Sequence, residues 1–146
     1  MHRYKYNMKK KKKVVVFGIF DGVHEGHRSL FAQAREHGQE LIAVVGRDAA
    51  SLALKLKKPR KNEQERRAMA LKEKLVDYAV LGDKKQSVYS VAKELNPDVI
   101  CLGYDQEDLR RDLESWMQKT GNHIPLVTLK PYKPKLYHTS LMPKGF

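Results

Sequence analysis

Short apolar runs alternate with helical patterns along this chain, and no other feature of the sequence limits the possible folds as strongly. The first run, VVVFGIF at 14–20, is rich in β-branched residues and is typical of a strand buried on both faces. We expect four further strands, over 40–46, 76–81, 99–102 and 124–129. Helical patterns occupy the connections, over 26–37, 62–75, 85–95 and 105–121. The alternation predicts an α/β fold, a doubly wound parallel sheet of five strands in a single domain.

Polar residues at the ends of these runs mark the predicted helix boundaries. Asn62 and Asp105 stand where a helix cap is expected, and Asn96 with Pro97 closes the helix before the fourth strand. In a sheet of this kind ligands bind at the carboxyl ends of the strands. The residues that directly follow the five strands are therefore where a functional site is expected.

Composition bounds the class of protein. The chain has 146 residues, enough for one domain with its own core, and 41% of them are hydrophobic. No apolar run approaches the length of a membrane-spanning helix. The basic N-terminus is not followed by the apolar run of a signal peptide. Cys101 is the single cysteine, so no internal disulfide can form and a cytoplasmic location is expected.

The net charge of +12 comes from the two ends of the chain rather than from its middle. Residues 1–13 hold seven basic side chains and no acidic one, and residues 130–146 hold four and none. Residues 14–129 hold 18 basic and 17 acidic side chains, which almost balance. A basic arm can hold nucleic acid or an anionic membrane, but a solvated tail is the favoured interpretation. We expect an arm over 1–13, one domain over 14–142 and a tail over 143–146, with no membrane partner and nucleic acid disfavoured.

The segment that follows the first strand reads GIFDGVHEGH, from Gly18 to His27. Gly18 and Gly22 allow the backbone to approach a ligand closely. Gly26 and His27 open the following helix, whose free N–H groups attract phosphate. His24 and His27 stand three residues apart, so both side chains can face one pocket, and an imidazole N–H is a good donor to a phosphate oxygen.

Three interpretations of the histidine pair compete. The histidines could be surface side chains on a tight turn, or two ligands of a zinc ion, since a spacing of three or four on a helix suits zinc. A zinc site lacks further ligands, because Cys101 lies inside a strand and His37 ends the helix. The third interpretation is a phosphate site with two histidine donors, and the glycines, the helix start and the strand end all favour it. We therefore assign no metal ligand.

These residues carry a family resemblance. GIFDGVHEGH resembles the G-x-F-D-x-x-H-x-G-H signature of the Rossmann-like nucleotidyltransferases, among them the cytidylyltransferases and the FAD synthases. The segments that look most like the small archaeal-type FAD synthases are VLGD at 80–83, PDVICLGYDQ at 97–106 and KPYKPKLYHTS at 130–140. A lysine pair at 55 and 57 and the triplet at 64–66 agree. The resemblance implies a Rossmann-like fold and a homodimer.

The resemblance also implies a reaction, in which a phosphate oxygen of an acceptor attacks the α-phosphate of a nucleoside triphosphate and pyrophosphate leaves. The catalytic residues that it implies are His24, His27, Lys57 and Arg66. The further nucleotide-binding residues that it implies are Gly18, Ile19, Phe20, Asp21, Glu25, Gly26, Lys55, Gly103, Asp105, Gln106, Tyr137, Thr139 and Ser140. Mg²⁺ would accompany the triphosphate and share the neutralisation of its charge.

Several of these residues also have a structural interpretation. Either Lys55 or Lys57 could contact phosphate, while the lysines around them are solvated. Arg66 could pair only with a nearby acid such as Glu63, and Asp105 could serve only as a helix cap. The residues expected in the core or in a dimer contact are Leu113, Trp116, Met117 and, as a small buried side chain, Cys101.

The acceptor and the base of the nucleotide stay open. The resemblance favours ATP and FMN, which would give FAD and pyrophosphate. Tyr104, Tyr132 and Tyr137 follow strand ends, where they could line a flat slot for the flavin ring. The alternatives are a cytidylyltransferase acting on glycerol 3-phosphate or a similar phosphoester, and an inactive relative that binds nucleotide or nucleic acid.

Overall fold

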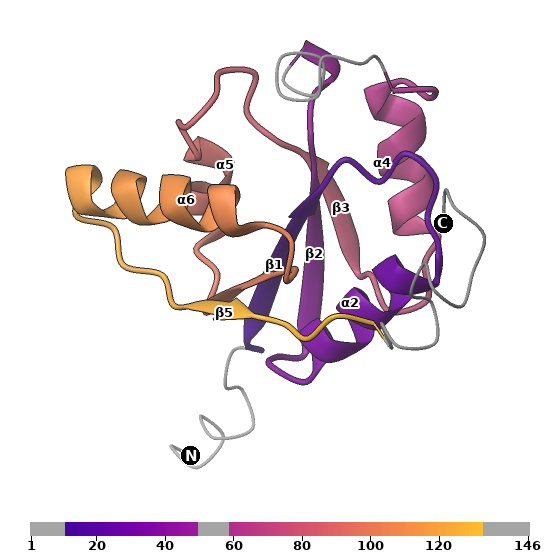
Figure 1. Ribbon diagram of the computed structural model, residues 1–146, viewed down its shortest axis with the longest axis horizontal. Helices are drawn as coiled ribbons and strands as arrows, with labels where there is room; N and C mark the ends of the chain where they lie inside the picture. Colours follow the sequence, from indigo (N-terminus) through magenta and orange to yellow (C-terminus); the bar gives the residue numbers. More distant parts are fainter. Residues whose placement is uncertain (1–10, 50–58, 133–146) are drawn as a thin grey trace, which may run out of the picture.

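The computed structural model describes residues 11–49 and 59–132, and in this part of the chain five parallel strands form one sheet (Figure 1). The strands are β1 (Lys13–Gly18), β2 (Glu40–Val45), β3 (Tyr78–Leu81), β4 (Val99–Leu102) and β5 (Leu126–Thr128). Their order across the sheet is β3-β2-β1-β4-β5. The predicted doubly wound parallel sheet in one domain is therefore confirmed.

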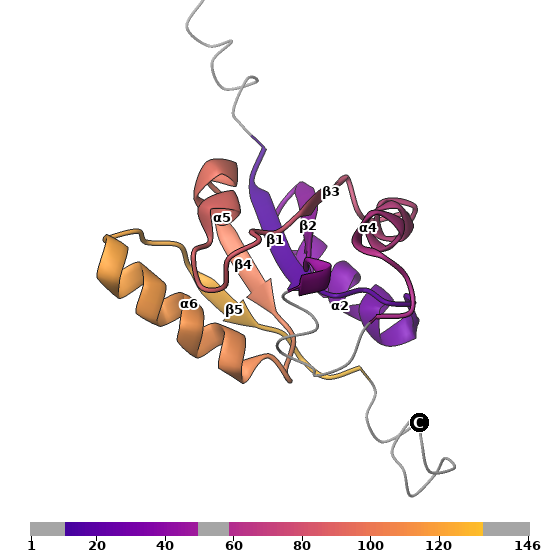
Figure 2. The ribbon, with the colours of Figure 1, turned by 90° about the horizontal axis from the view of Figure 1, so that it is seen from above.

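In the part of the chain that the structure describes, helices cover both faces of the sheet, as the view from above shows (Figure 2). The helices α2 (Glu25–Arg35) and α4 (Glu63–Leu71) lie on one face, and α5 (Ser90–Leu95) and α6 (Glu107–Thr120) lie on the other. Each face has its own buried apolar cluster, with Phe31 of α2 in the first and Leu113 of α6 in the second. The three-layer arrangement explains why the strands read as continuous apolar runs.

The central strand β1 shows this directly. Val14 and Val16 pack in the cluster under α2 and α4, whereas Val15 packs in the cluster under α5 and α6. All three side chains are fully buried. Because successive side chains of a strand point to opposite faces, a strand covered on both faces needs apolar residues at every position.

β1 ends two residues earlier than predicted. Phe20 lies beyond the strand in a left-handed conformation with φ of 57°, and its ring folds back over Gly18. A Cβ atom at Gly18 would lie 2.5 Å from Cζ of Phe20. The glycine at this position therefore makes room for a side chain of the same loop. Its role as a point of close ligand approach stays a prediction.

The helices differ from the prediction mainly at their ends. Asn62 caps α4 as predicted, accepting a hydrogen bond from the Glu65 N–H, but the helix stops at Leu71 rather than near 75. The helix predicted from 85 begins only at Ser90, because Ser87 and Tyr89 have positive φ and cannot continue a helix. Asp83 accepts hydrogen bonds at its start, from the Ser90 hydroxyl and the Val91 N–H.

The prediction that Asp105 caps the long helix is wrong. The N-cap position of α6 is Gln106, and the side chain of Gln106 turns away to the strand ends. Leu113 and Trp116 lie buried between α6 and the sheet, and Cys101 is fully buried in β4, as predicted. In the described ranges no helix is both long and apolar enough to cross a membrane.

The strand order defines where a ligand site is expected. The chain runs outward from β1 to β2 and β3, then crosses to the other side of β1 to form β4 and β5. The direction of winding therefore reverses between β1 and β4. The carboxyl ends of these two strands flank the crevice in which such sheets bind ligands, and the segment that joins β1 to α2 lies there.

Candidate active site

The segment between β1 and α2 is held by the ring of Phe20. This ring is 2% exposed and packs against Phe31 and His27, with ring centroids 5.6 and 5.4 Å apart. The positive φ of Phe20 is uncommon for a bulky residue and directs the ring inward under α2. Burial of this ring anchors the loop directly below the histidines.

His24 and His27 cap the N-terminus of α2 with their side chains. The Nδ1 atom of His24 accepts a hydrogen bond from the Gly26 N–H at 3.0 Å, and Nδ1 of His27 accepts one from the His24 N–H at 3.2 Å. This is the reciprocal arrangement of a capping box, with histidine in both positions. The two rings lie 4.0 Å apart between centroids, at an angle of 33°. The predicted meeting of both side chains at one place is therefore observed.

The capping bonds fix which nitrogen of each ring can serve a ligand. An Nδ1 atom that accepts a main-chain N–H has no proton, so the neutral ring carries its proton on Nε2. Each histidine therefore offers one Nε2–H donor. Two such donors at the positive end of a helix are suited to bind the oxygens of a phosphate group.

His27 stays neutral far below neutral pH. Burial is the main cause that lowers the pKa of His27 from 6.5 to about 4, and the neighbouring His24 lowers it further. Asp105 and Glu73 act in the opposite direction, and Arg28 adds a small lowering effect. The effect of Asp105 indicates that this residue, which follows β4, lies close enough to His27 to raise its pKa.

Gly26 gives the His24 ring its place. A Cβ atom at this position would lie 2.8 Å from Cε1 and 3.1 Å from Nδ1 of His24. Any other residue would push the ring away from the Gly26 N–H that it caps. The glycine between the two histidines is thus required by the close approach of the ring.

Two predicted nucleotide-binding carboxylates are engaged within the protein. Asp21 accepts main-chain hydrogen bonds from Arg60 at 2.8 Å and Lys61 at 3.1 Å, and the bond from Arg60 is the main cause that lowers the pKa of Asp21. Glu25 pairs with Arg28 at 2.6 Å. Asp21 therefore ties the loop after β1 to the segment that enters α4.

Arg66, a predicted phosphate ligand, is fully buried. Its Nη1 atom donates to the carbonyl oxygens of Ile19 and Gly46, both at 2.8 Å. Its Nε atom donates to the Lys61 carbonyl at 3.0 Å, and Nη2 pairs with Asp48 at 2.6 Å. The alternative interpretation, an ion pair with a nearby acid, is observed with Asp48 as the partner. Glu63, the acid named as an example from the sequence, pairs with Arg47 instead.

The side chain of Gln106 bridges the carboxyl ends of the adjacent strands β1 and β4. Its Nε2 atom donates to the Phe17 carbonyl of β1 at 2.9 Å, and its Oε1 atom accepts from the Gly103 N–H after β4 at 2.8 Å. The paired register of β1 and β4 ends at Val16 and Cys101, so this amide continues the connection beyond the ladder. Both ends of the Gln106 side chain are thereby committed to backbone.

The remaining predicted site residues divide into two groups. Ile19 and Gly103 supply the carbonyl and N–H groups described above, and Tyr104 beside them is 62% exposed. The residues that lie outside the described ranges are Lys55, Lys57, Tyr137, Thr139 and Ser140. For these five the assigned roles stay predictions.

Sequence reasoning missed a polar cluster after β2. Asp48 accepts from the Glu63 N–H, the Glu63 carboxylate accepts from the Asp48 N–H, and Arg47 donates to the Gly82 carbonyl after β3. The signal was present as Arg47-Asp48 directly after a predicted strand, a position where ligand sites form. The cluster links the ends of β2 and β3 to the N-terminus of α4.

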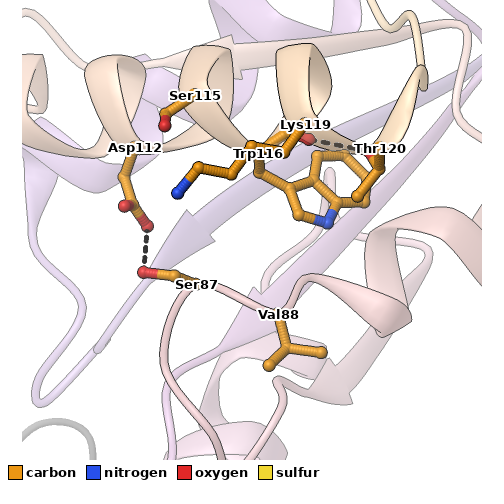
Figure 3. Close-up of a pocket in the computed structure, with 7 residues that line it drawn as sticks. All are labelled: Ser87, Val88, Asp112, Ser115, Trp116, Lys119 and Thr120. Carbon is orange, nitrogen blue, oxygen red and sulfur yellow. Dashed lines mark hydrogen bonds between the residues drawn. The ribbon is translucent and has the colours of Figure 1, made fainter.

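A hollow of about 330 Å³ lies away from these strand ends, between the residues before α5 and the second half of α6 (Figure 3). Asp112 faces Ser87 across it and accepts hydrogen bonds from the hydroxyls of Ser87 and Tyr89. Trp116 forms one wall. The Asp112 contacts hold the strained segment before α5, and we assign this hollow no part in the site at the strand ends.

The zinc interpretation of the histidine pair finds no third ligand within the described ranges. No group of three or more histidine, cysteine, aspartate or glutamate side chains gathers there in an arrangement that could hold a metal ion. The Nδ1 atoms of both histidines are also committed to main-chain N–H groups. Each ring keeps its Nε2–H group as a donor, as the phosphate interpretation requires, and that interpretation stays a prediction.

This fold and site define a class of protein. The chain belongs to the cytidylyltransferase-like family, whose model matches residues 15–140, and it is a nucleotidyltransferase. Curated relatives narrow the class. The chain is 41% identical over 120 residues to an FAD synthase of Aciduliprofundum boonei, an alignment covering 82% of this chain and 79% of the relative. It is 39% identical to an FAD synthase of Thermococcus sibiricus, covering 87% and 85%.

A third relative, an FAD synthase of Thermoplasma volcanium, is 33% identical over 90% of this chain and 92% of its own. A solved structure from the same organism, titled as a lipopolysaccharide core biosynthesis protein, superposes with a TM-score of 0.76. It is 32% identical and covers 85% of this chain and 100% of its own. A pantoate-beta-alanine ligase of Francisella tularensis, at 13% identity and a TM-score of 0.57 over 88% of this chain and 62% of its own, shares the fold alone.

Proposed function

We propose that this chain is an FAD synthase, an enzyme that transfers the adenylyl group of ATP to FMN. The observation that carries the proposal is the pair of Nε2–H donors that His24 and His27 present at the carboxyl end of β1. The chain is similar to FAD synthases over most of both lengths, and this similarity supports ATP and FMN as the substrates. The predicted alternative of an inactive relative is disfavoured because the histidine arrangement is intact.

The reaction forms one bond and breaks one bond. A phosphate oxygen of FMN attacks the α-phosphorus of ATP in line with the bond to the β-phosphate, that bond breaks, and pyrophosphate leaves. No nucleophile of the protein is needed. The protein contributes by holding the two substrates in line and by donating hydrogen bonds to charge that grows in the transition state.

The histidines are suited to that second task. Each Nε2–H donor is fixed by a capping bond at Nδ1, so little reorganisation is needed when the charge develops. His27 stays neutral because its pKa is lowered to about 4, and a neutral ring keeps Nδ1 free to accept the His24 N–H. The positive end of α2 adds to the attraction for phosphate.

Further groups complete the proposed site. Mg²⁺ arrives with the triphosphate as part of the substrate and shares the neutralisation of its charge. Lys55 or Lys57 would contact the β- and γ-phosphates, and Thr139 and Ser140 would add donors. Asp105, placed near His27 across the crevice, is suited to bind the ribose hydroxyls. The exposed Tyr104 offers a flat apolar face beside it.

The test is a competition assay. Equal concentrations of ATP and CTP are offered with either FMN or glycerol 3-phosphate, and the products are identified by mass. We expect FAD as the dominant product with release of one pyrophosphate per turnover. A clear preference for CTP and glycerol 3-phosphate would replace the FAD synthase assignment with the cytidylyltransferase one, and no product from any pair would favour the inactive relative.

We also propose that the protein acts as a homodimer in the cytoplasm. The expectation follows from the resemblance to nucleotidyltransferases that are commonly dimers. Sedimentation equilibrium at micromolar concentration measures the assembly directly. A mass near twice 16.9 kDa supports the proposal, and a mass of one chain contradicts it.

A further inference from the structure

One arginine in this protein is buried without any exposed surface. Arg66 has a side-chain exposure of 0%, which is rare for a residue that carries a charge throughout the accessible pH range. Burial of a guanidinium is tolerated only when its donors have partners. Here each of its three nitrogens donates a hydrogen bond that lies between 2.6 and 3.0 Å.

The partners come from two connections, the one between β1 and α2 and the one between β2 and α4, which meet at the strand ends. Ile19 follows β1, Gly46 and Asp48 follow β2, and Lys61 precedes α4. Three of these four partners are main-chain carbonyl oxygens. A phosphate ligand would have to compete with them, and it would leave buried carbonyls without donors if it displaced the guanidinium.

We propose that Arg66 is a positioning residue that holds the loop carrying His24 and His27, and that it does not bind the triphosphate itself. The proposal rests on the proposed nucleotidyl transfer at that loop. One nitrogen of the planar guanidinium donates to the carbonyls of both Ile19 and Gly46. This shared donor fixes the distance between the segments that follow β1 and β2.

The effect of Arg66 reaches the histidines through Phe20. The Ile19 carbonyl that Arg66 binds belongs to the peptide directly before Phe20. The ring of Phe20, in its left-handed backbone conformation, then packs against His27. Loss of the Ile19 anchor releases this peptide, and water gains access to His27. Arg66 thereby acts on the catalytic donors through packing and not through contact with substrate.

The kinetic test compares Arg66→Gln and Arg66→Lys with a matched control. We expect both variants to lower kcat by about 10- to 100-fold with KM for ATP nearly unchanged, since misplacement by about 1 Å costs this much. Lysine keeps the charge but cannot serve four acceptors, so it does not restore kcat. The control is Arg67→Gln, because the neighbouring Arg67 binds the Ala79 carbonyl of β3 and not the histidine loop.

Three kinetic outcomes overturn the proposal. A tenfold or larger rise in KM for ATP with kcat retained indicates direct phosphate binding, and so does restoration of activity by Arg66→Lys. If Arg67→Gln lowers kcat as much as Arg66→Gln does, then removal of any arginine from α4 has this effect, and the proposed role of Arg66 is wrong.

A second readout does not depend on substrate. Proton NMR measures the pKa of His27, which is about 4 in the intact protein because of burial. The charged groups that act on it are His24, Asp105, Glu73 and Arg28, and all are retained in the variants. We expect the pKa to rise toward 6.5 in Arg66→Gln and to stay low in Arg67→Gln. An unchanged pKa in folded Arg66→Gln contradicts the proposal, even if the proposed FAD synthesis is itself wrong.

A crystal structure of the unmutated protein with a non-hydrolysable ATP analogue covers the case in which Arg66 variants fail to fold. We expect the guanidinium to remain on the Ile19 and Gly46 carbonyls while the analogue contacts the histidines. A guanidinium turned to a phosphate oxygen would refute the proposal.

Discussion

His24 has two roles that mutation can separate. Its Nδ1 atom caps α2, and its Nε2–H group is the donor that we assign to phosphate. Asparagine is a favoured N-cap residue and retains an oxygen acceptor for the Gly26 N–H, but it lacks the imidazole donor. A substitution by asparagine therefore removes the chemistry and keeps the helix.

We expect His24→Asn to lower kcat by about two to three orders of magnitude, the usual effect of losing one preorganised donor, with little change in Tm. His24→Ala should lose the same activity and, in addition, about 1 kcal/mol of unfolding free energy, because the cap is lost as well. Steady-state kinetics and urea unfolding measure the two effects. His37→Asn, past the far end of α2, is the control. A His24→Asn enzyme with more than half of the original kcat would remove the assigned role.

The lowered pKa of His27 predicts a specific response to acid. The folded protein binds a proton at His27 only near pH 4, whereas the unfolded chain binds one near pH 6.5. Between these values the unfolded state holds more protons, so this contribution to stability is complete above pH 6.5 and is lost as the pH falls toward 4.

His27→Gln is the variant that isolates this contribution. Glutamine at the third helix position still accepts the capping bond from the His24 N–H but does not titrate. We expect urea unfolding at pH 7, 5 and 4 to show a smaller loss of stability for the variant than for the parent protein over this interval. Asp21, whose pKa is lowered from 3.8, loses its contribution only at lower pH and is present in both proteins. Equal losses in the two proteins would show that His27 titrates normally.

At the scale of the element, the side chain of Gln106 replaces main-chain hydrogen bonds between β1 and β4 at the end of their paired region. Methionine has nearly the same shape, so Gln106→Met would leave the Phe17 carbonyl and the Gly103 N–H without their partner. We expect a loss of about 1–3 kcal/mol in unfolding free energy by urea titration, because these groups are partly buried. Gln118→Met, on the exposed side of α6, should stay within about 0.5 kcal/mol. A Gln106→Met variant no less stable than this control would mean that the bridge contributes nothing.

The positions of the strands and their burial could be predicted, because β1, β2 and β4 are covered on both faces and so need apolar residues throughout. The ends of the strands could not. Phe20 is apolar because its ring packs under α2 from a loop, and a run of letters does not distinguish this from one more strand residue. The start of α5 was missed because Asp83, which accepts hydrogen bonds from Ser90 and Val91, lies seven residues before the helix.

The geometry of the histidine pair could be predicted from the sequence, whereas the surroundings of Arg66 could not. The histidine pair and the glycine between them are close in sequence, and their geometry follows from the start of one helix. The partners of Arg66 come from positions 19, 46, 48 and 61, and only the folded chain brings them together. A sequence therefore shows an arginine at 66 but not that its side chain is fully buried among these partners.

At the scale of the whole molecule, the contacts of Lys12 and Lys13 bear on the predicted boundary of the basic arm. The sequence placed the arm over 1–13, yet Lys12 and Lys13 are bonded to the rest of the domain. The Lys12 N–H donates to the Gln39 side chain at 2.7 Å, and the Lys12 carbonyl accepts from the N–H groups of Gln39 and Glu40. Lys13 donates to Asp98 and, through Nζ, to the Leu95 carbonyl. We propose that the domain begins at Lys12, before the predicted boundary.

Two truncations test this boundary. Removal of residues 2–9 should leave Tm and kcat unchanged, because every contact described for Lys12 and Lys13 is retained. Removal of residues 2–13 places Met1 directly before Val14 and leaves no residue at the position of Lys12. The hydrogen bonds of Lys12 to Gln39 and Glu40, at the amino end of the central strand, are then lost. Each lost hydrogen bond costs about 1 kcal/mol of unfolding free energy. Urea unfolding should show the longer deletion to be about 1–3 kcal/mol less stable, and equal stability of both truncated proteins would place the boundary after Lys13.

Oligonucleotide binding that disappears with residues 2–9 and weakens with salt would give the arm a role in nucleic-acid binding, against the expectation of a solvated tail.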